Sequence, residues 1–496
     1  MGVIRRLEPV ADCGPATERR KVSGVAVRIP LDVDAASSTS NGTAPWRGLE
    51  AARVERNIRY NVLHGVAANV ALNLATPFLG IFALKMGASN AQVALLSSGP
   101  AIVSLLAMIP GAVYVDRFPL KKRVTAAFFL ANRIFYLALA LVPLFDPDRR
   151  AAALVALVAL MNLPGAIGNV AWQSFVAAVV PPAQRAQAFA RRNRWMNIVG
   201  TATVVVAGRV LDVISYPLGY QIVLVAAFAA AMAEIYVFTL IEEPAPADGP
   251  GPNPGPTLAG GPPVAAAGAR GAVRAGAGAA APRAFGRTPA PAFRAALAEA
   301  AADIARHPEF VRYTAASIVF YFMWQAAWPL FTLYQVKVLG ANNLWISLLQ
   351  IANTGGAMFG YGFWARLADT RGHMRSLVVS TAGICLVPFY YALSHSLLTI
   401  TVLNLGTGVI FSGVNLSLFN ALLERVPDRH TTRYIAYYNW AVALATVAAP
   451  LAGVSLLSLL RNSYFWAFIV CAVGRVLGSL CFYLIARRER AWGRPA

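Results

Sequence analysis

Charged residues are scarce in this chain of 496 residues, at 13% of the sequence, and the acidic ones are scarcest, with 22 Asp and Glu against 43 Lys and Arg. A soluble domain usually carries about 25% charged residues, so a soluble enzyme is disfavoured. In a soluble protein the formal charge of +21 would point to a nucleic-acid partner. In a chain this poor in charge, the placement of the basic residues decides between nucleic acid and a membrane.

Cysteine is also rare. Cys13, Cys385, Cys471 and Cys481 have no paired spacing, and the last three lie in apolar runs where cysteine behaves as a small hydrophobic residue. Neither a disulfide framework nor a zinc site is predicted. The sequence also lacks a nucleotide-binding P-loop and any Ser/His/Asp or metal-ligand arrangement. We therefore predict no enzymatic activity, no metal and no direct drive by ATP.

Hydrophobic residues are abundant, at 57% of the chain, and the mean hydropathy is +0.55. They form twelve runs long enough for helices that cross the roughly 30 Å apolar core of a bilayer. The runs cover residues 61–84, 92–115, 124–145, 151–180, 195–215, 219–241, 312–337, 344–368, 376–395, 397–424, 434–459 and 463–486. Kinks are expected at Pro77, Pro164, Pro329 and Pro450. The predicted fold class is an all-α integral membrane protein with twelve transmembrane helices.

Basic residues gather in the loops on one side of these runs. The loops after the second, fourth, eighth and tenth runs contain Arg117, Lys121, Lys122 and Arg123; Arg185, Arg191, Arg192 and Arg194; Arg366, Arg371 and Arg375; and Arg425, Arg429 and Arg433. The positive-inside rule then places both termini in the cytoplasm of a multi-pass protein of the plasma (inner) membrane. Because topology and anionic membrane lipids account for the charge, no nucleic-acid partner is predicted.

Polar and low-complexity segments divide the chain. Residues 1–55 are predicted to be a disordered cytoplasmic N-terminus without a cleavable signal peptide. We expect an N-terminal six-helix bundle over 56–242, a cytoplasmic Pro/Gly/Ala-rich linker and lead-in helix over 243–310, a C-terminal six-helix bundle over 311–488 and a cytoplasmic tail over 489–496. The composition of the linker cannot form a packed core.

Landmarks of the first half recur in the second half. Gly87 and Gly340, Asn90 and Asn343, and Asp116 and Asp369 are 253 residues apart, whereas Asn169 and Asn415 are 246 apart. Each half has an even number of runs, so the two halves are predicted to be a parallel repeat.

The six-plus-six plan, the long central loop and a motif in each half together resemble the major facilitator superfamily. The family motif, roughly Gly-x-Leu-Ala-Asp-Arg-x-Gly-Arg-Arg, lies between the second and third helices, and here it is represented by residues 112–123 and 365–375. Alanine replaces its leading glycine in both copies. The resemblance covers about residues 56–488 and implies two pseudo-symmetric bundles that expose a midplane cavity alternately to either side.

The resemblance implies a gating role for the charged residues of the motif, which are Asp116, Arg117, Asp369 and Arg371. A carboxylate there would stabilise a closed state by pairing with a basic residue and a helix N-terminus. The alternative is that Asp116 and Asp369 are solvated loop residues that tune membrane insertion.

The resemblance also implies that the first, fourth, seventh and tenth helices line the substrate cavity. Their polar and aromatic candidates are Asn69, Asn73, Asn169, Trp172, Gln173, Tyr321, Trp324, Gln325, Trp328, Asn404 and Asn415. The spacing from Tyr321 to Trp328 predicts one helical stripe. An unpaired amide in hydrocarbon costs several kcal/mol, so the amides should face protein or water. Inter-helix hydrogen bonding and a packed aromatic core are the alternative roles.

These four helices have no Asp or Glu at membrane depth, which disfavours a sugar-acid or peptide symporter of the familiar type. The fifth helix lacks the glycine-proline signature of drug-proton antiporters. We predict a monomeric secondary active transporter or facilitator that moves a small neutral or amphipathic organic solute by alternating access. The alternatives are a non-transporting scaffold, assembly factor or sensor derived from this family, and multidrug-type efflux.

Three charges lie deep in the apolar runs: Arg133, Glu234 and Arg475. Ionisable residues at this depth are functional candidates by default, although structural pairing is the alternative because the third, sixth and twelfth helices are outer supports in the family. We predict that Arg133 and Glu234 face into the first bundle and pair or share a water path. Glu234 is then the candidate for coupling to a proton or other ion gradient. His64 is a weaker candidate, predicted at the membrane edge, and no other cofactor is expected.

Overall fold

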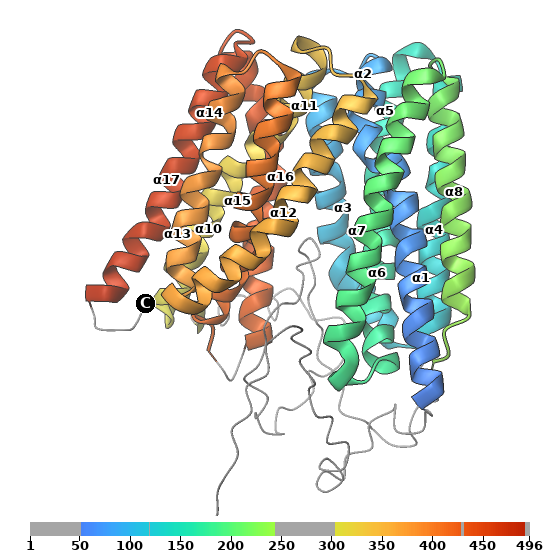
Figure 1. Ribbon diagram of the computed structural model, residues 1–496, viewed down its shortest axis with the longest axis horizontal. Helices are drawn as coiled ribbons and strands as arrows, with labels where there is room; N and C mark the ends of the chain where they lie inside the picture. Colours follow the sequence, from blue (N-terminus) through green and yellow to red (C-terminus); the bar gives the residue numbers. More distant parts are fainter. Residues whose placement is uncertain (1–50, 119, 244–302, 428–430, 492–496) are drawn as a thin grey trace, which may run out of the picture. The chain divides into compact units, whose positions relative to one another are not determined.

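The computed structural model describes residues 51–118, 120–243, 303–427 and 431–491, and these form helices joined by short turns (Figure 1). The first half contains α1 (Ala51–Ala75), η1 (Thr76–Phe78), α2 (Leu79–Lys85), α3 (Asn90–Asp116), α4 (Lys121–Leu141), η2 (Val142–Leu144), α5 (Pro147–Leu160), α6 (Asn162–Val179), α7 (Pro182–Val213) and α8 (Leu218–Thr239). The second half contains α10 (Pro308–Ala326), α11 (Trp328–Leu333), η3 (Tyr334–Val338), α12 (Asn343–Arg371), α13 (His373–Ile384), α14 (Leu386–Leu393), α15 (Leu397–Leu423), α16 (Thr431–Leu459) and α17 (Tyr464–Ala491). Most of the predicted N-terminal segment and linker, and the end of the tail, lie outside the described residues.

Eleven helical stretches of the described chain are long and apolar enough to cross a membrane, and all of them coincide with predicted runs. The predicted run over 344–368 is not among the eleven, although it corresponds to α12, a helix of 29 residues and therefore about 43 Å long. Its first half carries Gln350, Asn353 and Thr354, which lower its apolar character. The all-helical class and the twelve-helix plan are thus confirmed, with one helix more polar than the rest.

Proline accounts for most of the interruptions within spans. Pro77 lies in η1, and Pro329 is the second residue of α11, directly after the break from α10. Pro164 lies in the first turn of α6, after α5 ends at Leu160. Pro450, in contrast, lies inside an uninterrupted α16. A further break between α13 and α14 precedes Pro388, which cannot donate a hydrogen bond to the carbonyl of Ile384.

The structure places the repeated residues in equivalent positions. Gly87 and Gly340 both have positive φ, at 85° and 67°, and each makes the turn that leads into the second helix of its half. A residue with a Cβ atom is strained in this conformation, which explains the glycine at both positions. Helices α3 and α12 then begin at the matched residues Asn90 and Asn343.

Small residues let α12 and α15 pack closely. A Cβ atom added at Gly356 would lie 1.9 Å from the backbone oxygen of Leu405, and one added at Gly408 would lie 1.9 Å from the oxygen of Asn353. Close backbone approach through small residues is a common way for helices to associate in membranes. The glycine-rich run of α15 therefore serves helix packing.

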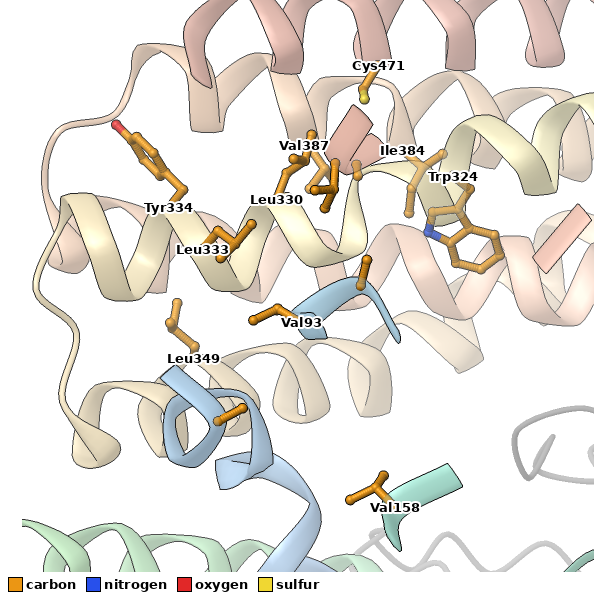
Figure 2. Packing of buried hydrophobic residues seen from close by; sticks show 14 of the residues in the cluster. Val93, Val158, Trp324, Leu330, Leu333, Tyr334, Leu349, Ile384, Val387 and Cys471 are labelled. Carbon is orange, nitrogen blue, oxygen red and sulfur yellow. The ribbon is translucent and has the colours of Figure 1, made fainter. Parts of the chain in front are cut away.

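One buried hydrophobic cluster includes residues of both halves. Figure 2 shows Leu333 of α11, Val93 of α3 and Leu349 of α12 near one another, whereas Leu330 of α11 lies beside Val387 of α14. These contacts join the beginning of α3 and the α11 segment, so apolar packing contributes to holding the two halves together.

Candidate functional site

A cavity of about 200 Å³ lies between α1 and α7 of the first half and α12 of the second half. Its polar lining consists of amide and hydroxyl side chains, which are Asn69, Asn73, Asn197, Thr201, Gln350 and Thr354. Among the residues that the structure describes, no charged side chain lines this cavity. The arrangement offers hydrogen-bond donors and acceptors without a fixed charge, at the boundary between the two halves.

Two of the predicted cavity residues, Asn69 and Asn73, are held in place by α1 and α7. The Nδ2 atom of Asn69 donates to the backbone oxygen of Met196 at 2.6 Å, and Nδ2 of Asn73 donates to the oxygen of Asn69 at 2.8 Å. Gly200 lies against both amides, and a Cβ atom there would be 2.2 Å from Nδ2 of Asn69. Each amide can donate two hydrogen bonds, so an N–H remains on each for another partner.

The other lining residues were missed because the prediction searched only four helices. Gln350 and Thr354 are four residues apart on α12, and Asn197 and Thr201 are four apart on α7. This spacing places each pair on one face of its helix. The signal was present in the predicted runs 195–215 and 344–368, and searching every run for such pairs would have found it.

The predicted aromatic stripe of the seventh helix is divided between α10 and α11, and its two tryptophans differ in burial, while its role in lining a cavity stays a prediction. The break at Ala327 assigns Trp328 to α11, where the side chain is 47% exposed. Trp324 is buried and packs against Phe320, Tyr321 and Phe411. These contacts correspond to the alternative of a packed aromatic core.

The remaining predicted cavity residues are not gathered in the amide-lined cavity. Asn169 is exposed, and Gln173, Gln325, Asn404 and Asn415 are half-buried. Their predicted role in substrate binding stays a prediction.

Arg133 and Glu234 form a buried ion pair between α4 and α8, as the sequence predicts. The Nε atom of Arg133 donates to Oε2 of Glu234 at 2.9 Å, and Nη2 donates to Oε1 at 3.0 Å. The Glu234 side chain is 1% exposed. Such a two-point contact is the strong geometry for a guanidinium and a carboxylate. Arg133 also donates through Nη1 to Oδ1 of Asn132 at 2.9 Å.

His64 lies beside this pair, so the prediction that it sits at the membrane edge is wrong. Helix α1 begins at Ala51, which places His64 about 20 Å along the helix. Its side chain is 2% exposed, and Nε2 is 3.5 Å from Oε1 of Glu234. The error arose because the helix extends ten residues before the apolar run, which starts at residue 61.

Several buried polar atoms in the interior of the first half have no hydrogen-bond partner among the described residues. These atoms are both ring nitrogens of His64, the amide nitrogen and oxygen of Asn61, Nε1 of Trp172 and Nε of Arg192. Unpaired polar atoms in a protein interior are usually satisfied by ordered water. The interior of the first half therefore places several unpaired polar groups near Glu234.

Arg192 was predicted in a loop, but α7 begins at Pro182 and includes it. Its guanidinium carbon lies 4.7 Å from the centre of the Trp172 ring. Gly65 of α1 makes room for it, because a Cβ atom there would be 2.3 Å from Nε of Arg192. The predicted cavity residue Trp172 thus lies in the interior of the first half, next to a cation.

Arg475 has a different environment in the second half. It is 1% exposed, and it donates through Nη1 to the oxygen of Ile384 and through Nη2 to the oxygen of Trp324, both at 3.0 Å. Pro388 leaves the Ile384 carbonyl without its helical partner, and Trp324 lies in the last turn of α10. Arg475 therefore satisfies carbonyls at two helix breaks, and no carboxylate of the described chain pairs with it.

The motif loops show no closed gate in the residues that can be described. Arg117, Asp369 and Arg371 are exposed and form no ion pair with another described residue, and the side chain of Asp116 is not among those described. In the first loop, Glu243 accepts hydrogen bonds from the backbone N–H groups of Lys121 and Lys122, where α4 begins. The gating role of the motif stays a prediction.

At the opposite ends of the helices, Asp212 of α7 joins the two halves. Its carboxylate accepts hydrogen bonds from the backbone N–H groups of Asn343 and Leu344, at 3.1 and 3.0 Å, and from the Asn343 side chain at 3.0 Å. The Tyr220 hydroxyl donates to Oδ1 of Asn343 at 2.7 Å. We call these contacts the Asp212 latch. A carboxylate is stabilised there by the positive end of the α12 dipole.

A second polar contact lies at the same end, where Lys337 donates to Oδ1 of Asn90 at 2.8 Å. The repeated residues Asn90 and Asn343 each start the second helix of their half and each contact the other half. The cavity begins about 12 Å below Asp212, since Val204 of its lining precedes Asp212 by eight residues. Polar contacts between the halves therefore lie on this side of the cavity.

Two six-helix halves around an interfacial polar cavity define a multi-pass membrane transporter, and comparison with known proteins specifies the family. The family model of the Major Facilitator Superfamily matches residues 63–423 and 313–496. The chain belongs to the major facilitator superfamily and is a secondary transporter.

Solved structures support the fold. A mutant form of the nucleoside transporter NupG matches with a TM-score of 0.59 and 11% identity, over 87% of this chain and 99% of that one. A bacterial homologue of the human lysosomal transporter Spinster, inward-facing and unoccupied, matches with a TM-score of 0.55 and 13% identity, over 88% and 98% of the two chains. No curated protein sequence matches the chain. At these identities the likeness concerns the fold alone.

Proposed function

We propose that this transporter carries a small uncharged or amphipathic organic solute across the plasma membrane. The observation that carries the proposal is the cavity between α1, α7 and α12, whose polar lining is made of amides and hydroxyls only. Amide groups satisfy the hydroxyl, carbonyl or amide groups of a neutral solute, whereas a charged solute would require a desolvated partner of opposite charge. A volume of about 200 Å³ suits a small molecule or one part of a larger one.

Alternating access follows from the position of the cavity between the halves. We propose that the Asp212 latch holds the external side closed while the solute exchanges with the cytoplasm. Opening the external side then requires Asp212 to leave the N-terminus of α12, which its carboxylate contacts through two backbone N–H groups. Both termini are cytoplasmic in this proposal, and its support is the concentration of arginine in the loops opposite the latch. The functional unit is a monomer, because the cavity is completed within one chain.

A screen followed by two substitutions tests the substrate proposal. Detergent-purified protein is screened by thermal shift against uncharged and charged metabolites, and the stabilising compounds are assayed for uptake in proteoliposomes. Asn73→Ala and Gln350→Ala should each raise KM about threefold to tenfold, because one hydrogen bond of about 0.5–1.5 kcal/mol is lost. Asn162→Ala is the matched control, since Asn162 donates to the backbone oxygen of Val158, four residues earlier at the junction of α5 and α6, and does not line the cavity. Selective transport of charged compounds, or equal effects of all three substitutions, would contradict the proposal.

We further propose that Glu234 couples transport to a proton gradient. The groups that face it are His64 on α1, Arg133 and Tyr136 on α4, and Arg192 on α7. In this proposal the unpaired polar atoms of His64, Trp172 and Arg192 line a path for water to Glu234. A carboxylate at membrane depth can exchange a proton while Arg133 keeps its charge.

The test of coupling uses proteoliposomes with an imposed pH gradient. Glu234→Gln should remove the dependence of uptake on the gradient and leave counterflow of the solute, because an amide cannot take up the proton. Glu55→Gln is the matched control, since Glu55 is an exposed residue paired with Arg59 and Arg191. Uptake that responds to the gradient equally in Glu234→Gln and wild type would exclude Glu234 as the coupling site.

A further inference from the structure

A groove with a volume of about 660 Å³ lies between α10 and α17, apart from the cavity between the halves. Its wall on α10 is formed by Ala315, Ala316 and Val319, and its wall on α17 includes Leu484 and Ile485. These side chains are apolar, and several are exposed, with Val319 40% and Leu484 50% exposed. An apolar hollow of this size at the lipid-facing surface has to be filled by an apolar chain, because water would find no hydrogen-bond partners there.

The groove exists because the two helices pack tightly along only part of their length. A Cβ atom at Gly478 would lie 2.9 Å from the Cα atom of Phe320, and one at Gly474 would lie 2.4 Å from the sulfur of Met323. One turn nearer the start of α10, the small side chains of Ala315 and Ala316 leave the space between the helices open.

Three arginines stand at one end of the groove. Arg312 lies in the first turns of α10, and Arg487 and Arg488 lie near the end of α17. Both helix ends belong to the predicted cytoplasmic side. All three side chains are exposed, and none of them forms an ion pair or hydrogen bond with another described residue.

The two walls have the same order of residues. On α10, the wall residues Ala315, Ala316 and Val319 follow Arg312 by three, four and seven residues. On α17, the wall residues Ile485, Leu484 and Cys481 precede Arg488 by three, four and seven residues. This spacing puts each arginine on the same helix face as its wall. The apolar part of the groove thus extends about 10 Å from the guanidinium groups into the membrane.

We propose that this groove, defined by α10, α17 and the three arginines, is a binding site for one anionic phospholipid of the cytoplasmic leaflet. The phosphate of the headgroup contacts Arg312, Arg487 and Arg488, and an acyl chain occupies the groove beside Ala315 and Leu484. Guanidinium groups bind phosphate through paired N–H donors, which supplies the charge complementarity. The inter-bundle linker is a poor occupant, because residues 249–298 contain five arginines and no acidic residue.

The experiment is a titration of the delipidated full-length protein in detergent, with bound lipid counted by native mass spectrometry. The probes are phosphatidylglycerol and phosphatidylcholine with identical acyl chains, and inorganic phosphate as competitor. We expect the first phosphatidylglycerol to bind at least about tenfold more tightly than phosphatidylcholine, since each interfacial arginine contributes about fivefold. Equal binding of the two lipids would overturn the proposal.

Two variants separate the site from general surface charge. The triple variant Arg312→Gln, Arg487→Gln, Arg488→Gln should lose the preference, whereas the matched triple variant Arg123→Gln, Arg194→Gln, Arg366→Gln should keep it, because these three exposed arginines lie outside the groove. Equal losses in the two triple variants would show diffuse attraction and overturn the site.

Ala315→Phe fills the apolar wall without changing the charge, and it should weaken phosphatidylglycerol binding by at least about fivefold because the acyl chain loses its place. Unchanged lipid binding in this variant, or displacement of the lipid by millimolar inorganic phosphate, would show that the arginines bind a headgroup or free phosphate without the groove.

Discussion

Arg133 in the first half and Arg475 in the second half both lie deep in the apolar part of the protein, and their surroundings differ. Arg133 makes a two-point contact with the carboxylate of Glu234, and His64 lies within 3.5 Å of the same carboxylate. Arg475 contacts two backbone carbonyls, from Ile384 and Trp324. In the first half, the arginine side chain forms an ion pair of zero net charge with a carboxylate that can take up a proton. In the second half, the arginine side chain is a fixed cation that donates hydrogen bonds to carbonyls at two helix breaks.

The difference shows that depth in the membrane does not by itself determine which kind of group an arginine contacts. The predictions for Arg133 and Arg475 came from the same rule, that charges in apolar runs are functional candidates. The two arginines differ in the chemical group that each of them contacts. A carboxylate partner adds a group that can change its charge, whereas a carbonyl partner only receives a hydrogen bond.

The largest expected loss of stability comes from removing the Glu234 carboxylate from its pair with Arg133. Glu234→Ala leaves the Arg133 cation buried without its partner, so the free energy of unfolding should fall by about 3–5 kcal/mol. Denaturant unfolding in detergent micelles, followed by circular dichroism, measures this change. The double substitution Arg133→Leu, Glu234→Leu should recover most of the loss, because neither charge remains. A double variant no more stable than Glu234→Ala would mean that the pair itself is needed for the fold.

A smaller loss of stability is expected from substitution of Arg475, because its removal leaves no buried carboxylate without a partner. Arg475→Gln keeps one donor group for one of the two carbonyls and leaves the other unpaired, which should cost about 1–3 kcal/mol. The same unfolding measurement applies, with the exposed Arg461→Gln as control, expected within about 0.5 kcal/mol of wild type. Dependence of uptake on a pH gradient should persist in Arg475→Gln. Loss of this dependence in Arg475→Gln would mean that Arg475 takes part in coupling, and the two halves would then not differ in this respect.

The smallest loss of stability is expected at the break between α5 and α6 in the first half. Asn132 donates through Nδ2 to the oxygen of Met161, between α5 and α6, and the backbone N–H of Gly165 donates to the same oxygen. Asn132→Leu leaves this carbonyl with a partner, and it leaves Nη1 of Arg133 with the Tyr136 hydroxyl at 3.5 Å after the Asn132 acceptor is lost. The free energy of unfolding should therefore fall by only about 0.5–1.5 kcal/mol. A loss as large as that of Arg475→Gln would indicate that the Gly165 bond cannot support the break alone.

Much of the fold could be predicted because it depends on properties that are local in sequence. The apolar runs locate the helices, and the offset of 253 residues relates Gly87 to Gly340, whose positive φ the structure shows at both turns. The pairing of Arg133 with Glu234 could be inferred because two opposite charges at similar depth have few other partners.

The site could be predicted only in part, because rotation and helix ends are set by packing. Gln350 lines the cavity since α12 turns that face toward α1 and α7, and apolar periodicity does not report this rotation. Arg192 and His64 were misplaced because α7 and α1 extend beyond their apolar runs. Asp212 stands near a helix end like many surface acids, and only the arrival of α12 from the other half makes it a latch.

The polarity of α12 has a consequence for how the protein is made. A helix with Ser347, Gln350, Asn353 and Thr354 in its first half gains less from transfer into lipid than its eleven companions. Its glycines fit against α15, which is synthesised later, while its first residues bind α7, which is already in place. We therefore expect α12 to enter the bilayer together with its neighbours, so that biogenesis of the second half depends on the first half being inserted before it.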